Sequence, residues 1–75
     1  MDSIDELIKI GKKQLEDGRY DDALSLFQKA ILLNQNDPDL WNLKGIALRS
    51  LGRYNEAIEC FNKSLEIDPR DKNAS

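Results

Sequence analysis

The residues GRYDDALSLFQKA at positions 18–30 return, with substitutions, as GRYNEAIECFNKS at positions 52–64. The same shift of 34 residues places the whole of residues 4–37 over residues 38–71 without a gap. Nine pairs are identical in this alignment, and they are Asp5/Asp39, Gly11/Gly45, Gly18/Gly52, Arg19/Arg53, Tyr20/Tyr54, Ala23/Ala57, Phe27/Phe61, Lys29/Lys63 and Asp37/Asp71. Self-similarity at a fixed period of this length is typical of stacked repeat architectures. The sequence therefore predicts two copies of one structural unit and a function that resides on an extended surface.

Length and composition predict a single small domain, residues 1–75, in an aqueous compartment. The chain is 40% hydrophobic and 33% charged, which suits a helix-rich globular domain. The net charge is −3 with both signs interleaved, so the chain offers no basic surface for nucleic acid or for an anionic membrane. No apolar run approaches the roughly 18–20 residues that cross a bilayer, and the N-terminus lacks a secretory apolar segment. We expect a cytoplasmic protein.

Each unit is predicted to hold two helices joined by a tight turn. In the first unit Ser3 is a good N-cap, and Glu6 three residues later completes a capping box. Gly18 supplies the positive φ that often ends a helix. Asp21 or Asp22 is expected to open the second helix, where the helix dipole favours carboxylates.

The second unit follows the same plan after the connector Asn34–Pro38, in which Asp37 is the expected N-cap and Pro38 the first helical residue. Its helices are predicted over about Pro38–Leu51 and Asn55–Ile67, and Asp68–Pro69 ends the second one. The polar residues 70–75 are too few for a full C-terminal capping helix. The predicted fold is all-α, with four antiparallel helices in repeats of about 4–37 and 38–71.

The spacing of small and aromatic residues resembles that of the tetratricopeptide repeat family. The second unit carries the pattern at Trp41, Gly45, Gly52, Tyr54, Ala57, Phe61 and Pro69. The first unit carries it at Gly11, Gly18, Tyr20, Ala23 and Phe27. It departs from the pattern at Leu7, which replaces Trp, and at Gln35, which replaces the closing Pro. The resemblance covers residues 4–71 and implies a right-handed α-solenoid of two helix-turn-helix repeats.

Small residues are expected where the two helices of each repeat cross. Gly11 and Ala23 are predicted to meet in the first repeat, and Gly45 and Ala57 in the second. A larger side chain at these positions would push the helices apart. The rings of Tyr20 and Phe27, and those of Tyr54 and Phe61, are then expected to fill the space towards the next helix.

The resemblance also implies a concave groove, lined by the first helix of each repeat, that binds a peptide or a partner helix. Carried over position by position, the groove consists of Asp5, Ile8, Lys12, Leu15, Asp39, Asn42, Ile46 and Arg49. The alternative is that these residues form only the solvated side of amphipathic helices. One subfamily clamps the C-terminal carboxylate of chaperones, but Ile8, Lys12 and Leu43 stand at the positions to compare, so we do not expect that ligand. A partner with local positive charge is mildly favoured.

The last helix keeps the wide apolar arc of its counterpart in the first repeat, although no third repeat follows within the sequence. The arc contains Ile58, Cys60, Phe61, Leu65 and Ile67. Either the chain is a fragment of a longer array, or this face is buried against another copy, and we expect self-association as a homodimer or a stacked array. Symmetric face packing, head-to-tail stacking and exchange of a segment through the connector all remain open.

An enzyme is not expected. The chain contains no histidine, the commonest general base and metal ligand, and its acidic pairs are explained by caps and turns. Cys60 has no histidine partner and is expected to be a buried structural thiol. We predict no catalytic residue, no metal site and no cofactor. The alternatives to a peptide-binding scaffold are a purely homo-oligomerising module and, as a distant third, a helical-repeat RNA binder, which acidic groove residues disfavour.

Overall fold

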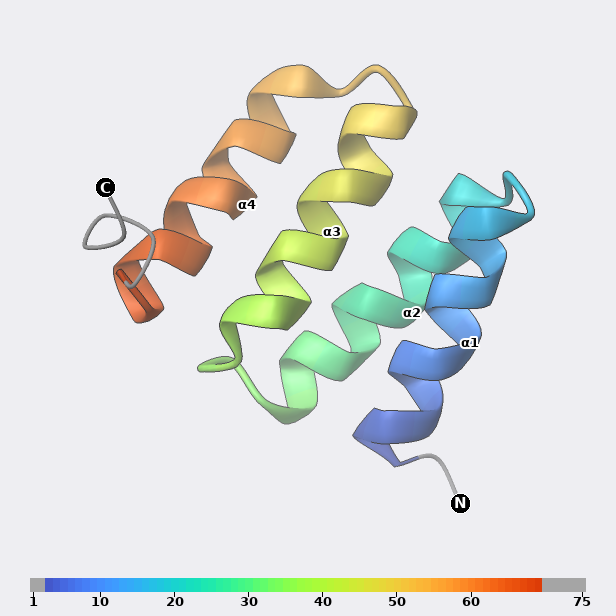
Figure 1. Cartoon of the computed structure of the whole chain (residues 1–75), viewed down its shortest axis with the longest axis horizontal. Helices are drawn as coiled ribbons and strands as arrows, with labels where there is room; N and C mark the ends of the chain where they lie inside the picture. Colours follow the sequence, from blue (N-terminus) through green and yellow to red (C-terminus); the bar gives the residue numbers. More distant parts are fainter. Residues whose placement is uncertain (1–2, 70–75) are drawn as a thin grey trace.

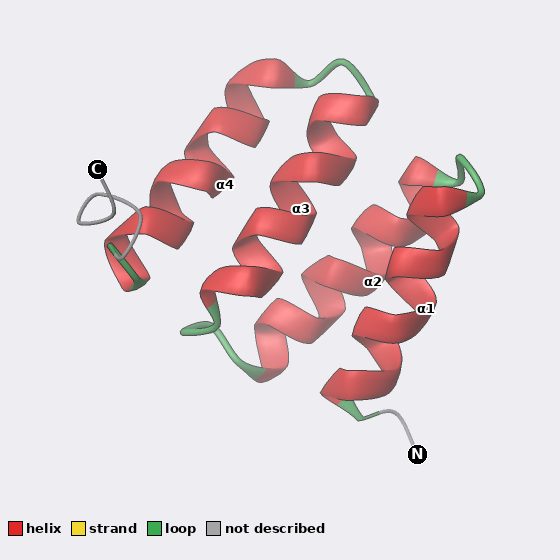
Figure 2. Cartoon of the chain, viewed as in Figure 1, coloured by secondary structure: helices red, strands yellow, loops and turns green. Residues whose placement is uncertain are grey.

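The computed structural model describes residues 3–69, and within that range the chain forms four α-helices and no β-strand (Figures 1 and 2). The helices are α1 (Ile4–Glu16), α2 (Tyr20–Leu33), α3 (Pro38–Ser50) and α4 (Tyr54–Ile67). Consecutive helices pack against one another, so that α3 lies between α2 and α4 (Figure 1). The predicted all-α solenoid of two helical hairpins is confirmed. The expected polar tail, residues 70–75, lies outside the described residues.

Side-chain caps fix the start of the first helix of each hairpin, as predicted. The Ser3 Oγ atom accepts a hydrogen bond of 3.2 Å from the Glu6 backbone N–H. The Asp37 carboxylate accepts one of 3.0 Å from the Asp39 backbone N–H, and Pro38 is the first residue of α3. Each cap satisfies a backbone donor that a helix leaves without an internal partner.

The second helices begin earlier than expected, at Tyr20 and Tyr54, and the prediction that Asp21 or Asp22 opens α2 is wrong. The preceding turn explains the difference. Gly18 has a φ of +80°. The Arg19 backbone N–H donates a hydrogen bond of 2.8 Å to the Gln14 carbonyl, and this bond closes α1 with a Schellman turn. The Arg19 carbonyl then accepts from the Ala23 N–H at 3.0 Å, so the next helix starts at once.

Hydrogen bonds hold the connector between the hairpins even though Gln35 replaces the proline of the family pattern. The indole N–H of Trp41 donates to the Gln35 carbonyl at 2.9 Å. The Asn34 side chain accepts from the Asn36 backbone N–H at 3.2 Å. These two bonds restrict a segment that carries no ring constraint of its own before Pro38.

Two clusters of buried side chains form the core, and α3 contributes to both. The first joins α2, α3 and α4 through Ala23, Leu24, Phe27, Ala47, Leu48, Ala57 and Cys60. The second joins α1, α2 and α3 through Leu7, Ala30, Ile31 and Leu40. Because α3 is covered on both sides, it fixes the position of each hairpin relative to the other. The expectation that Cys60 is buried is confirmed.

The glycines of the first helices in each repeat make room for aromatic rings. A Cβ atom added at Gly11 would lie 2.5 Å from an atom of the Phe27 ring, and one at Gly45 would lie 2.6 Å from the Phe61 ring. The sequence paired these glycines with Ala23 and Ala57, and the nearest atoms belong to the phenylalanines instead. Each ring therefore packs back onto its own repeat rather than only towards the next helix.

Candidate functional site: a cleft between the first helices

A cleft of about 530 Å³ runs between α1 and α3. Its lining residues come from the exposed side of both helices and from the residue before α3, and they are Asp5, Ile8, Lys12, Asp37, Asp39, Asn42, Leu43 and Ile46. The 34-residue period places Asp5 and Asp39, or Ile8 and Asn42, at equivalent points of the two helices. Equivalent positions of the two repeats therefore form the two sides of the cleft.

Six of the eight residues predicted for the groove line this cleft: Asp5, Ile8, Lys12, Asp39, Asn42 and Ile46. The other two do not. Leu15 is half-buried and packs against the first core cluster. Arg49 is exposed, and its guanidinium lies 5.9 Å from the centre of the Phe61 ring, within the range of a cation–π contact. The last turn of each first helix therefore contributes nothing to the cleft.

Two lining residues were missing from the predicted groove, Leu43 and Asp37. Leu43 is half-buried and adjoins the predicted Asn42 in the sequence. Asp37 had been assigned as an N-cap, and its carboxylate performs that role while it also borders the cleft. Each residue lies close in the sequence to a residue that was predicted for the groove, and this proximity could have identified it. The helical spacing used for the prediction selects other positions.

The lining chemistry combines an apolar floor with an acidic border. Ile8, Leu43 and Ile46 are half-buried. Around them stand three carboxylates, those of Asp5, Asp37 and Asp39, against the single ammonium group of Lys12. The cleft is therefore suited to an apolar side chain flanked by basic groups, because the field of the lining carboxylates attracts cations.

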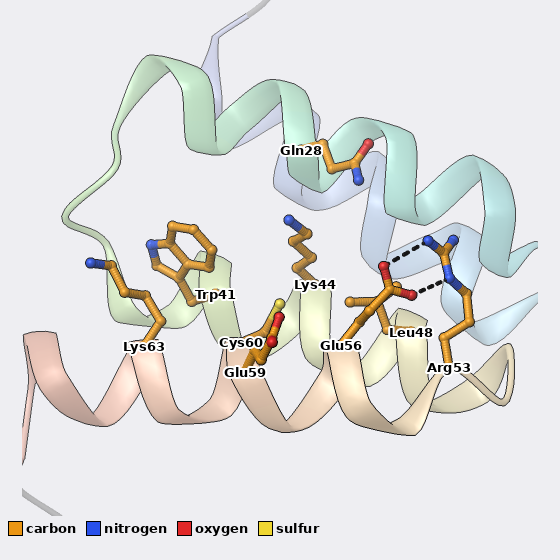
Figure 3. Close-up of a pocket in the computed structure, with 9 residues that line it drawn as sticks. All are labelled: Gln28, Trp41, Lys44, Leu48, Arg53, Glu56, Glu59, Cys60 and Lys63. Atoms are coloured by element: carbon orange, nitrogen blue, oxygen red, sulfur yellow. Dashed lines mark hydrogen bonds and ion pairs between the residues drawn. The ribbon is translucent and has the colours of Figure 1, made fainter.

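A second cleft, of about 270 Å³, lies over α3 between α2 and α4 (Figure 3). The Lys44 ammonium lies 5.3 Å from the centre of the Trp41 ring, and that of Lys63 lies 6.0 Å from it. Arg53 donates two hydrogen bonds to the Glu56 carboxylate, one of them 2.9 Å long between Nη2 and Oε1 (Figure 3). Arg53 and Glu56 thus pair with each other, and the two lysine ammonium groups lie near the Trp41 ring.

This second cleft also contains Cys60, which is 4% exposed. Burial raises the pKa of its thiol, although the nearby Lys44 works in the opposite direction. A protonated, buried thiol is a poor nucleophile. Among residues 3–69 no group of histidine, cysteine, aspartate and glutamate side chains is arranged to hold a metal ion. Within the same range no helix has the length and apolar character needed to span a membrane.

The exposed side of α4 is the third surface to consider. Of the four residues predicted for a self-association face, Ile58 is exposed, whereas Phe61, Leu65 and Ile67 are half-buried. Ile67 follows Ile58 by nine residues, which at about 100° per residue places it on the opposite side of the helix. Tyr54, four residues before Ile58, shares the exposed side and was not included in the prediction.

Comparisons with known proteins agree with this architecture. Two family models described as tetratricopeptide repeat match residues 6–40 and 38–71. An uncharacterised protein of Methanocaldococcus jannaschii is 44% identical over 61 residues, which are 81% of this chain and 66% of that protein. Anaphase-promoting complex subunit 7 of Homo sapiens is 47% identical over 51 residues, or 68% of this chain and 9% of its own length. The Hsp70-Hsp90 organising protein of Plasmodium falciparum is 40% identical over 62 residues, which are 81% of this chain and 24% of that protein. The chain thus spans from about a tenth to two thirds of these relatives.

Proposed function

Because the chain belongs to the tetratricopeptide repeat family, we propose that it holds a segment of a protein partner in the cleft between α1 and α3. Members of this family are generally protein-interaction modules, which supports the proposal. The names of the relatives, an organising protein and a subunit of a complex, describe proteins that work with partners. The single observation that carries the proposal is the cleft itself, which is apolar at its floor and acidic at its border.

The proposed ligand is a peptide or helix that places one apolar side chain over Ile8, Leu43 and Ile46, with lysine or arginine on either side. The apolar contact supplies affinity, and the carboxylates orient the segment and speed its association. The same carboxylates disfavour RNA, the distant alternative, because phosphates would meet like charge at the cleft border.

The test uses fluorescein-labelled peptides in which a central leucine is flanked on each side by two lysines, against the same peptides with glutamate in place of lysine. Fluorescence anisotropy should show tighter binding of the lysine peptide. The difference should shrink as salt rises from about 20 to about 300 mM, because the cleft border is exposed to screening. Equal binding of both peptides at low salt would contradict the proposed charge preference, and no binding of either would contradict the groove.

Two variants locate the binding site. Ile46→Ala removes part of the apolar floor and should weaken binding about tenfold. Asp39→Asn removes one border charge and should weaken the lysine peptide about twofold to fivefold at low salt only. The matched control is Glu66→Gln, which also removes one exposed negative charge but lies on α4 away from the cleft. The control should bind as the parent chain does, and circular dichroism should show unchanged helix content in all three.

A second candidate function, self-association, is favoured by a different observation. Tyr54 and Ile58 on α4 are 63% and 55% exposed, which is unusual for two large apolar side chains one helical turn apart. We propose that copies of the chain bind one another through this side of α4. Sedimentation between about 10 µM and about 1 mM should show a concentration-dependent dimer, whereas a monomer over the whole range would contradict it. A cytoplasmic location stays a prediction.

A further inference from the structure

The outer side of α4 carries a stripe of four residues, Tyr54, Ile58, Phe61 and Leu65, that we call the end stripe. Their equivalents in α2 are Tyr20, Leu24, Phe27 and Ile31. In α2 that stripe is covered by α3, and Leu24 and Ile31 are only 6% and 7% exposed. In α4 the stripe is covered only in part: Phe61 packs against Gly45 of α3 and is half-buried, whereas Ile58 is 55% exposed. The end stripe therefore has the composition of a surface that packs against another helix.

The outward side of α1, the first helix, is polar where the end stripe of α4 is apolar. Three residues of α3 are almost fully buried in the two core clusters, and they are Leu40, Ala47 and Leu48. One repeat earlier, the equivalent positions of α1 are Glu6, Lys13 and Gln14. Glu6 and Lys13 are exposed, and the same surface of α1 offers Ile10 as its one large apolar side chain. The outer side of α1 is thus made polar by substitution at the positions that would have to be buried.

This difference opposes the stacking that the repeat itself would suggest. If one copy placed α1 on the α4 of another, as α3 lies on α2, the charged groups of Glu6 and Lys13 would enter positions that are 0% exposed in the chain's own α3. Desolvating charges without partners opposes association strongly. Head-to-tail addition, the arrangement that grows into filaments, is therefore disfavoured.

The end stripe is suited to a second copy of itself. None of its four residues is charged, whereas the next row along the helix, Asn55, Glu59, Asn62 and Glu66, holds two exposed glutamates. In a two-fold arrangement a group near the axis meets its own copy, so a charge there would face a like charge. The absence of charge from the stripe itself removes that repulsion at the axis, and Glu59 and Glu66 lie to one side of it.

We propose that two copies of the chain pair through their end stripes, α4 against α4 about a two-fold axis, to form a closed dimer with the polar α1 surfaces outermost. This inference rests on the proposed self-association and specifies its geometry. In such a dimer the four hairpins form one continuous apolar interior that ends in a polar helix on both sides. The clefts between α1 and α3 stay open, one in each copy, so that the dimer would present two equal binding sites.

The first experiment measures association of the full chain by sedimentation. Ile58→Lys places a charge on the end stripe and should raise the dimer dissociation constant about tenfold or more, since each copy would bring that charge to the axis. Ile58 is already half-exposed, so the variant should fold. The matched control is Leu32→Lys, at a position on α2 that is 76% exposed and lies outside the stripe. It should dimerise as the parent chain does.

The second experiment identifies which surfaces meet. In a Cys60→Ala background, chains with Ile58→Cys are treated with a short bismaleimide, alone and mixed with differently tagged chains carrying Lys13→Cys. Two-fold pairing predicts cross-links between two chains that both carry Ile58→Cys, and none between an Ile58→Cys chain and a Lys13→Cys chain. Head-to-tail stacking predicts the opposite. The background chain must show the parent's dissociation constant in sedimentation.

The outcomes separate the two proposals. A dimer that cross-links through Ile58→Cys alone supports the two-fold geometry. Association that joins the Lys13→Cys and Ile58→Cys chains and grows beyond the dimer overturns the geometry but leaves self-association standing. A parent chain that stays monomeric to about 1 mM overturns both, and the peptide-binding assay then remains as the test of the groove.

Discussion

The two second helices, α2 and α4, carry almost the same pattern and have different surroundings. Phe27 is 0% exposed, whereas Phe61, at the same place in the second repeat, is half-buried. Leu24 is 6% exposed and Ile58 is 55% exposed. Both helices end at the same relative point and seat their ring on a glycine of the helix before. The difference in burial therefore comes from the neighbouring α3, not from the helix itself.

The first helices of the two repeats, α1 and α3, differ in their outward residues and not only in their surroundings. Their backbones and caps are alike, but their outward side chains differ in kind, with Glu6 and Lys13 in place of Leu40 and Ala47. Within residues 3–69, α1 thus presents polar residues on its outward side, whereas α4 presents apolar ones.

Replacing the phenylalanine ring of each second helix should change stability by different amounts. Phe27→Ala should lower the free energy of unfolding by about 3–5 kcal/mol, because it leaves a cavity in a closed core. Phe61→Ala should cost about half as much, since the ring is already partly in contact with water. Urea unfolding followed by circular dichroism at low micromolar concentration measures both. Equal losses would mean that the two ends are equally covered.

A smaller difference is expected at the glycines beneath these rings. Gly11→Ala should cost about 2–3 kcal/mol, because the new methyl group would meet the enclosed Phe27 ring. Gly45→Ala meets the Phe61 ring at a similar distance, but that ring has room to move outward, so about 1 kcal/mol is expected. The same urea titration applies. If Gly45→Ala lowered the free energy of unfolding as much as Gly11→Ala does, the Phe61 ring would be held as tightly as the Phe27 ring.

One substitution should stabilise the first repeat. The Gln14 Oε1 atom is buried and has no hydrogen-bond partner among residues 3–69, whereas the equivalent Leu48 belongs to the first core cluster. Gln14→Leu should therefore raise the free energy of unfolding by about 1 kcal/mol. Thermal unfolding would show it as a higher midpoint. A lower midpoint would mean that the amide contributes a bond that leucine removes.

The smallest effect concerns the turn of the second repeat, where Arg53 and Glu56 form two hydrogen bonds. In the first repeat the equivalent Arg19 and Asp22 approach only to 4.0 Å. The hydrogen bond from Arg53 lowers the pKa of the Glu56 carboxyl below its ordinary value. A lowered folded-state pKa means that the pair stabilises the fold above the unfolded-state pKa and loses this contribution as the pH falls through the folded one.

An NMR titration of the Glu56 carboxyl carbon should show a midpoint below that of an ordinary glutamate. In Arg53→Gln the midpoint should return upward, and stability should decline less steeply than in the parent chain as the pH falls below the ordinary pKa of a glutamate. Both groups are exposed, so only a slight change in overall stability is expected. An unchanged midpoint in Arg53→Gln would show that the pair is too loosely held to affect the carboxyl.

Much of the fold could be predicted from the sequence, because the deciding signals are local. The caps at Ser3 and Asp37 and the glycine turn at Gly18 each act within a few residues of their position. The 34-residue period then predicted two equivalent hairpins. The starts of α2 and α4 were missed by one residue or more because the carboxylates in their first turns gave a stronger signal than the Schellman turn before them.

The candidate site could be predicted only in part. Helical spacing correctly placed Ile8 and Ile46 on the side of the cleft, but it could not show that Leu15 turns into the core or that Arg49 lies over the Phe61 ring. Those outcomes depend on how the helices cross, which is set by packing between residues distant in the sequence. The same holds for the partners of the two helix glycines and for the exposure of the α4 tyrosine.

The helices, their order and the family could be read from the amino-acid sequence, because repeat period, caps and turn glycines act through the local backbone. Packing between the helices set which side chains share the cleft, which ring is enclosed and which side of α4 stays exposed among residues 3–69. Burial is a property of the space between elements, and the same residue type at the same repeat position is covered or exposed according to the helix beside it.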